Sequence, residues 1–241
     1  MSLVDEVVAA HGGRERWATA TRLRAQIASG GLLLRTRVPR RKLAGEIQVE
    51  LHEPVSSFTP FPAPGSRGVF DHGAVRVETV DGEVLESRDH PRELFFGRPG
   101  LRRNLRWDAL DLCYFAGYAW WNYVCAPFLF EEPGVGVEEI EPWRAGSETW
   151  RRLAVTFSPE IHTHSPEQVF YFDAELRLRR HDYVAEIVGR WAHAAHMCAD
   201  HVEADGLVFP TRRWVRPIGP GNRALPGPTL VALRLSEIEV E

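Results

Sequence analysis

Histidine is the residue type in this chain best suited to chemistry near neutral pH. Six of its ten histidines fall within 40 positions of one another: His162, His164, His181, His193, His196 and His201. An imidazole can move a proton near pH 6.5 or bind a divalent metal through a neutral nitrogen. On a strand, His181 and Tyr183 share one face and Asp182 lies on the other. His181, Tyr183 and His164 are therefore alternative acid–base catalysts, although recognition of a ligand headgroup is the preferred role.

Metal binding is a weaker alternative. His162 and His164 lie on one side of an extended segment and could provide two ligands, but no His-Glu-x-x-His motif follows. His193 and His196 share a face on a helix, whereas a strand would point them to opposite faces. We expect no metal and no cofactor.

Other functional classes lack their sequence signatures. There is no Gly-x-Ser-x-Gly motif, and the three cysteines, Cys113, Cys125 and Cys198, match neither a zinc spacing nor a disulfide framework. The net charge of −4 argues against a nucleic-acid partner. The N-terminus shows no secretory signal, and the cysteines indicate a reducing compartment, so the expected location is the cytoplasm. The Arg-rich, Lys-poor composition suits a GC-rich bacterial genome.

The longest uncharged segment is residues 112–130, and it is rich in aromatic side chains. Its polar and aromatic content favours a helix buried in protein over a membrane span. Asp108 is placed to cap this helix, which should end before Pro127. One face packs as core, and a second face is expected to line a ligand cavity with Tyr114, Tyr118 and Trp121.

A basic segment precedes this helix and is expected to be a loop over residues 97–106. It contains Arg98, Arg102, Arg103 and Arg106. Beside the mouth of an apolar pocket, these arginines could contact an anionic headgroup or, transiently, a membrane surface.

The remainder reads mainly as antiparallel strands. Leu23, Ala25 and Ile27 alternate with polar residues, and Asp-Gly pairs at 81–82 and 205–206 predict tight hairpins. Residues 32–38 are also expected to form a strand, and the Pro-rich segment 54–64 an irregular edge. Ser2 and Asp5 predict a capped N-terminal helix that stops at Gly12-Gly13.

Three segments resemble the lipoprotein-localisation-factor (LolA/LolB-like) superfamily. They are the entry His11-Gly12-Gly13-Arg14-Glu15-Arg16-Trp17 leading to Leu23-Arg24-Ala25, then Phe170-Tyr171-Phe172-Asp173 with Leu176-Arg177-Leu178-Arg179-Arg180, and Asp205-Gly206-Leu207-Val208-Phe209-Pro210-Thr211. The resemblance implies a curved antiparallel sheet, an unclosed barrel plugged by helices, whose cavity holds acyl chains. No functional residue of the family can be placed in this sequence.

These observations predict one mainly β (α+β) domain over residues 1–241: a strongly curved antiparallel sheet or open barrel, with an N-terminal helix and the aromatic helix in its concave face. The expected function is binding of a hydrophobic or amphipathic, lipid-like small molecule between sheet and helix. The candidate ligand-binding residues are Tyr114, Tyr118, Trp121, His162, His164, Tyr171, His181, Tyr183, His193 and His196. The alternatives are an enzyme using the His and Tyr residues, and a module that dimerises over the aromatic helix.

Overall fold

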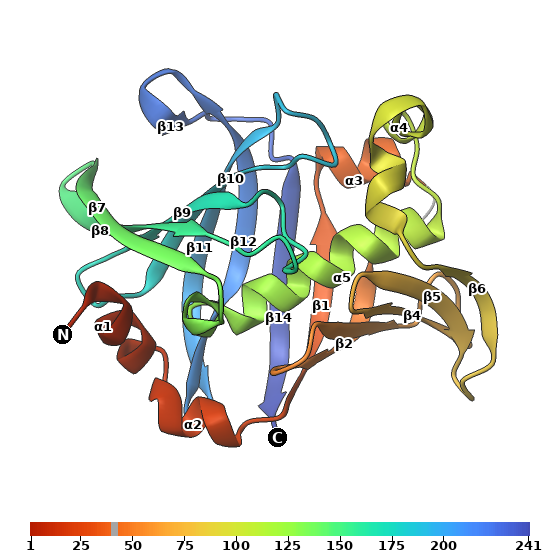
Figure 1. Cartoon of the computed structure of the whole chain (residues 1–241), viewed down its shortest axis with the longest axis horizontal. Coiled ribbons are helices and arrows are strands. Elements are labelled where there is room, and N and C mark those ends of the chain that lie inside the picture. Colours follow the sequence, from red (N-terminus) through yellow and green to blue (C-terminus); the bar gives the residue numbers. More distant parts are fainter. Residues whose placement is uncertain (40–42) are drawn as a thin grey trace. The chain divides into compact units, whose positions relative to one another are not determined.

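Antiparallel strands dominate the structure, a computed structural model that describes residues 1–39 and 43–241 (Figure 1). The chain divides into two compact units. Unit 1 comprises Met1–Ala20 and Cys125–Thr229, and unit 2 comprises Thr21–Val124 and Leu230–Glu241.

Unit 1 is built on an antiparallel meander in the order β12-β11-β10-β9-β8-β7, with β13 added on β12. Its strands are β7 (Gly136–Ala145), β8 (Glu148–Thr156), β9 (Glu167–Phe172), β10 (Leu178–Val184), β11 (His193–Ala204), β12 (Leu207–Gly219) and β13 (Arg223–Ala224). The Asp205–Gly206 turn joins β11 to β12, as predicted.

Short helices complete unit 1. They are α1 (Leu3–Ala10), α2 (Gly13–Thr19), and the 3-10 turns η2 (Phe128–Glu131) and η3 (Pro220–Asn222). The predicted capping box is present, because the Ser2 hydroxyl accepts from the Asp5 amide and the Asp5 carboxylate accepts from the Ser2 amide. The indole of Trp17 stacks on Phe128 with ring centroids 4.2 Å apart, which ties α2 to η2.

Unit 2 holds a second antiparallel array in the order β6-β5-β4-β3-β2-β1-β14. Its strands are β1 (Arg22–Gly30), β2 (Ala44–Glu50), β3 (Val55–Thr59), β4 (Ser66–Asp71), β5 (Ala74–Thr79), β6 (Val84–Arg88) and β14 (Val231–Val240). Its helices are α3 (Leu32–Arg37), η1 (Pro91–Phe95), α4 (Gly97–Arg103) and α5 (Ala109–Cys125), whose last residue falls in unit 1.

The aromatic helix α5 is the predicted one, and every residue in it is buried. Asp108 and Asp111 cap its start reciprocally, each carboxylate accepting from the other's amide. Within unit 2, the Ser56 hydroxyl donates to the Gly117 carbonyl, and the Trp121 indole donates to the Glu50 carbonyl. These bonds fix α5 against β2 and β3.

Three local predictions are wrong. Residues 32–37 form helix α3 rather than a strand, and the buried pair Leu34 and Val38 has the four-residue spacing of a helix face. Residues 97–103 form helix α4 rather than a loop. Strand β3 pairs on both sides, with β2 and β4, so the Pro-rich segment is not an edge; its prolines flank the strand instead of interrupting it.

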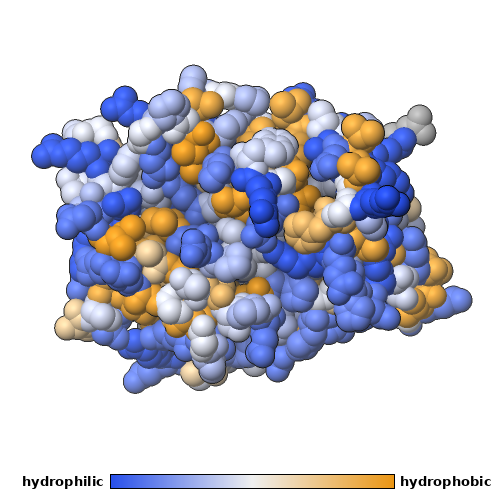
Figure 2. Space-filling view, turned by 45° about the horizontal axis from the view of Figure 1, so that its top comes forward, coloured by the Kyte–Doolittle hydropathy of each residue, from blue (hydrophilic) through white to orange (hydrophobic). Residues whose placement is uncertain are grey.

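The predicted fold class is confirmed: the described strands form an unclosed antiparallel sheet, and helices are few. Among the described residues, no helix is long and apolar enough to cross a bilayer. Apolar side chains do reach the surface on the right of Figure 2, over the part of unit 2 that carries α4 and β6.

Candidate functional site

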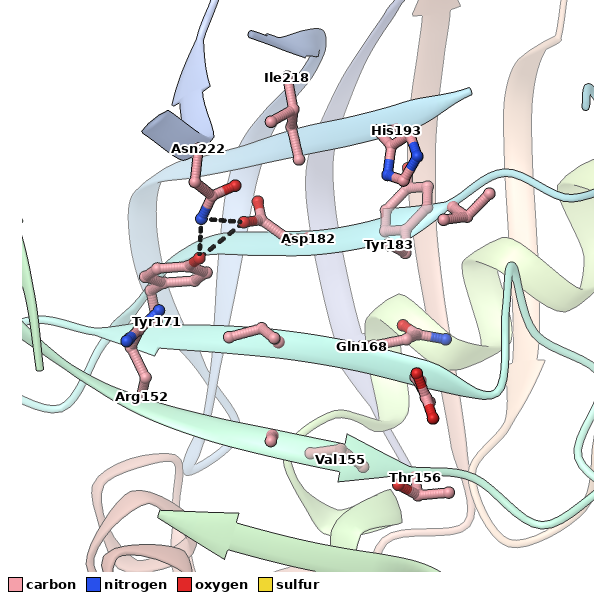
Figure 3. Close-up of a pocket in the computed structure, with 14 residues that line it drawn as sticks. Arg152, Val155, Thr156, Gln168, Tyr171, Asp182, Tyr183, His193, Ile218 and Asn222 are labelled. Atoms are coloured by element: carbon pink, nitrogen blue, oxygen red, sulfur yellow. Dashed lines mark hydrogen bonds between the residues drawn. The ribbon is translucent and has the colours of Figure 1, made fainter. Parts of the chain in front are cut away.

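A groove of about 480 Å³ lies in unit 1, on one face of β8, β9 and β10 (Figure 3). The first residue of β11, the end of β12 and η3 complete its walls. This volume is in the range of small-molecule sites in proteins. The groove therefore qualifies as a binding site by size alone, and its lining decides what it can bind.

One end of the groove is a polar network that the fold holds in place. The Tyr171 hydroxyl donates to Asp182 Oδ2 at 2.7 Å, and Asn222 Nδ2 donates to the same hydroxyl at 2.8 Å. Arg180 donates to both Asp182 oxygens, at 2.6 and 2.8 Å. Burial, and then the negative charge of Asp182, raise the pKa of Tyr171 to about 12. The phenol therefore stays protonated at neutral pH.

Two arginines and two aromatic rings are layered beneath this network. The buried Arg180 guanidinium lies 4.9 Å from the Tyr171 ring centre and 5.7 Å from that of Trp143. The half-buried Arg152 lies 5.6 and 5.8 Å from the same two rings and donates to the Glu141 carbonyl. Since Arg180 is bidentate to Asp182, Arg152 is the groove cation better placed to meet a ligand anion.

The middle of the groove is aliphatic. The strand register pairs Arg152 with Tyr171, Ala154 with Val169 and Thr156 with Glu167, so Ala154 and Val169 lie between the two polar ends. Ile218 on β12 is also part of the lining, and these three aliphatic residues are partly exposed. The other end is formed by exposed residues, among them Thr156 and His193. The lining is thus amphipathic along its length, with a cation at one end.

A second cluster of functional side chains lies on the opposite face of β10 and β11 and in the β8–β9 loop, because strand residues alternate. We call it the histidine cluster: His164, His181, His196 and Tyr183. The Tyr183 ring stacks on His164 at 4.0 Å, and His181 lies 4.8 Å from Tyr183 and 5.9 Å from His196. The Tyr183 hydroxyl is 3.4 Å from His196 Nδ1.

The residues of the histidine cluster are buried, and two of them, His181 and His196, are uncharged. Burial lowers the pKa values of both His181 and His196 well below 6.5, and the positive charge of Arg213 lowers them further. His181 also hydrogen-bonds the Gln168 side chain and stacks on Phe170 at 4.1 Å. His181 and His196 therefore lie in the core of unit 1 as neutral imidazoles.

The structure separates the predicted ligand-binding residues into different places. Tyr171 and His193 line the groove. Tyr183 also borders it, although its ring stacks in the histidine cluster on the opposite face. His164, His181 and His196 join Tyr183 in the histidine cluster, and half-buried His162 lies in the β8–β9 loop. As predicted for a strand, His181 shares its face with Tyr183 and not with Asp182, and His193 and His196 face opposite ways.

The helix residues Tyr114, Tyr118 and Trp121 are buried in α5. Tyr114 packs between Phe70, Phe95 and Tyr118 at 5.1–6.1 Å, so within unit 2 aromatic rings surround it. Their role as ligand contacts stays a prediction. In the described part of the chain, no group of three His, Cys, Asp or Glu side chains is arranged to hold a metal ion.

Sequence reasoning missed Arg152 and Asn222 as groove residues, and it missed Arg180 as the buried cation that holds Asp182. Arg180 and Asp182 stand two apart on one strand and so share a face, which is a signal the sequence does contain. Asn222 sits in a Pro- and Gly-rich loop, and nothing in the sequence places that loop over β9 and β10.

No protein-family model matches this sequence, and no curated protein matches it. Solved structures do. A LolA superfamily protein from Nitrosomonas europaea aligns with a TM-score of 0.54 at 10% identity, covering 99% of this chain and 92% of that one.

Two further structures align over the same extent. A putative outer membrane lipoprotein-sorting protein domain from Vibrio parahaemolyticus has a TM-score of 0.52 at 9% identity, covering 99% of this chain and 91% of that one. A DUF1329 family protein from Desulfovibrio piger has a TM-score of 0.50 at 11% identity, covering 99% and 92%. The strand order and these alignments together show that the chain has a LolA-like fold.

Proposed function

We propose that this protein binds a hydrophobic or amphipathic small molecule, and that the groove of unit 1 holds it. The observation that carries the proposal is the order of the lining: a cation and a phenol at one end, then aliphatic side chains. The similar structures include a protein named for lipoprotein sorting, and that likeness supports a lipid-like ligand.

The ligand we infer has an apolar body and an anionic or strongly polar head. Ala154, Val169 and Ile218 offer aliphatic contacts to the body. The head meets Arg152, whose planar guanidinium suits a carboxylate or phosphate. The neighbouring Tyr171, Asp182 and Asn222 are already bonded to one another, so they shape this end without having to reorganise.

Two alternatives gain less from the structure. The histidine cluster is buried on the sheet face opposite the groove, and burial keeps its His181 and His196 neutral, so it is better explained as core than as a catalytic site. Dimerisation over the aromatic helix requires an exposed apolar face that a second copy could cover. Every residue of α5 is buried, so the helix offers no such face.

The first test fills the middle of the groove. Replacing Val169→Trp puts an indole where the ligand body is proposed to lie, and we expect it to weaken binding of a dansyl-labelled fatty acid at least tenfold. Fluorescence titration gives the dissociation constant. Leu85→Trp adds the same ring on exposed strand β6 and serves as the matched control, with unchanged affinity.

The second test addresses the head. Arg152→Gln is expected to weaken binding of the dansyl fatty acid about tenfold, the size of one charge-assisted hydrogen bond, and to leave its uncharged alcohol analogue unaffected. Equal affinity of wild type, V169W and R152Q for the acid, with all three proteins folded by circular dichroism, would overturn the groove as the site.

A further inference from the structure

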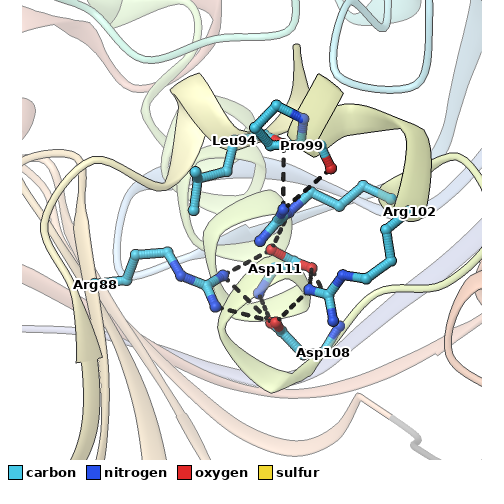
Figure 4. Close-up of polar contacts among 7 residues, drawn as sticks. Arg88, Leu94, Pro99, Arg102, Asp108 and Asp111 are labelled. Atoms are coloured by element: carbon cyan, nitrogen blue, oxygen red, sulfur yellow. Dashed lines mark hydrogen bonds and ion pairs between the residues drawn. The ribbon is translucent and has the colours of Figure 1, made fainter. Parts of the chain in front are cut away.

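Helix α4 is fixed to unit 2 by one face. Its Gly100 lies so close to Phe95 that an added Cβ would stand 2.2 Å from the Phe95 carbonyl oxygen. On the same side the buried Arg103 donates to Asp111 Oδ1 at 2.7 Å and to the Leu94 carbonyl at 3.2 Å (Figure 4). Because this face is held by close contact and a buried ion pair, the opposite face of α4 must point outward.

That outward face exposes large apolar side chains. Leu101 in α4 is 67% exposed, and Leu105, in the turn that follows Arg103, is 76% exposed. The Arg106 amide still donates to the Arg102 carbonyl four residues back, so this turn keeps a helical spacing and brings Leu105 next to Leu101. Phe96, just before the helix, is 43% exposed. Phe96, Leu101 and Leu105 are the large apolar side chains that this segment exposes.

Arginines surround these side chains. Residues 96–107 contain four arginines and no acidic residue. Arg103 is buried on Asp111, and Arg102 is paired with Asp108 at 2.9 Å, so these two of the four predicted membrane-contact arginines have a structural role. Arg98 and Arg106 are exposed beside the leucines.

We propose that this α4 surface, made of Phe96, Arg98, Leu101, Leu105 and Arg106, docks on an anionic lipid bilayer. Three apolar side chains are too few for a stable protein–protein interface, which needs about 800 Å² from each partner. They suit shallow insertion at the headgroup boundary, where apolar side chains enter the lipid and guanidinium groups meet phosphates. The proposal is independent of the groove, which lies in the other unit.

Unit 2 contains a second exposed apolar patch, and the charges around this one are negative. In the β5–β6 hairpin Val80, Val84 and Leu85 are 55%, 54% and 57% exposed. Their neighbours in sequence are acidic: Asp81, Glu83 and Glu86. The hairpin therefore exposes apolar side chains to a similar extent as the α4 surface, but an anionic bilayer repels its carboxylates. We expect the hairpin not to bind such a bilayer, so it serves as the matched control.

The experiment is co-sedimentation of the full chain with vesicles. We expect binding to vesicles of phosphatidylcholine with phosphatidylglycerol, weaker binding to pure phosphatidylcholine, and release by high salt. L101S/L105S should lower the partition coefficient about tenfold through lost apolar burial. R98Q/R106Q should lower it about twenty-fivefold on anionic vesicles, at roughly fivefold per arginine. V84S/L85S should bind like wild type.

Several outcomes would overturn the proposal. One is equal binding to both kinds of vesicle, and another is loss of binding in V84S/L85S that matches the loss in L101S/L105S. Sedimentation velocity provides a third: a dimer that dissociates in L101S/L105S would show that a second copy covers the patch. V169W, the groove variant, should still bind vesicles, which keeps this result separate from that of the ligand-binding test.

Discussion

At the scale of single residues, Asp111 is the most consequential charge in unit 2. It is buried at the start of α5 and accepts from Arg88 and Arg103, each at 2.7 Å (Figure 4). An ion pair buried in this way is costly to break: Arg88 would keep Asp108, but the buried Arg103 would stay without its carboxylate in a low-dielectric site.

Asp111→Asn is therefore expected to lower the free energy of unfolding by about 3 kcal/mol. Urea denaturation of wild type and variant measures the difference. Asp200→Asn is the matched control, since the Arg212–Asp200 pair is largely exposed and its loss should cost less than about 1 kcal/mol. A D111N protein as stable as D200N would show that the buried cluster contributes no net stability.

At the scale of elements, α5 depends on the absence of one side chain. Gly117 sits opposite strand β4, and a Cβ at this position would stand 2.2 Å from the Phe70 Cβ. A glycine costs a helix interior about 1 kcal/mol relative to alanine, so its presence is explained by close packing and not by helix propensity.

Gly117→Ala should consequently destabilise the protein by about 1–3 kcal/mol, because the overpacking exceeds the gain in helix propensity. Thermal unfolding followed by circular dichroism checks the sign. In the control Gly30→Ala, at the end of β1, an added Cβ meets nothing within 4 Å, and stability should be unchanged or slightly raised. A stabilised G117A would mean that α5 and β4 can separate at little cost.

At the scale of the whole molecule, buried histidines predict acid sensitivity. Burial lowers the pKa of His11 and of His201 to about 4, and those of His181 and His196 well below 6.5. The unfolded chain binds protons to these groups below pH 6.5, while the folded chain does not until about pH 4 or lower. Stability is therefore complete above pH 6.5 and is lost as the pH falls.

Urea midpoints should decrease steadily between pH 7 and pH 4.5. This window lies above the range in which paired carboxylates such as Asp108, with a pKa of about 2, lose their contribution. His11→Gln should flatten the curve, by up to about 3 kcal/mol near pH 4, because it removes one buried titrating ring.

The exposed His72 provides the opposite case. Its hydrogen bonds to Asp71 and Glu53 raise its pKa, so its contribution to stability is present at acid pH and is lost as the pH rises. His72→Gln should steepen the acid loss slightly. A wild-type midpoint that stays constant from pH 7 to pH 4.5 would contradict the neutral state of the buried histidines.

The sequence by itself determined the features that depend on neighbours along the chain. Period-two alternation marked β1, Asp-Gly turns marked two hairpins, and the Asp108 cap and the uncharged run of residues 112–130 marked α5, because these signals act over a few residues. The face assignments of His181, Tyr183 and Asp182 also followed, since alternation on a strand is a local rule.

Only the tertiary structure decided which face of strands β8, β9 and β10 carries a groove and which face is packed as core. Asn222 reaches Tyr171 across 51 positions and Asp182 across 40, and the register of β8 and β9 places Arg152 beside Tyr171. The same long-range packing filled the surroundings of His181 and of Tyr114 with aromatic rings. Strand pairing and loop placement are set by burial summed over the whole chain, which no window of sequence contains.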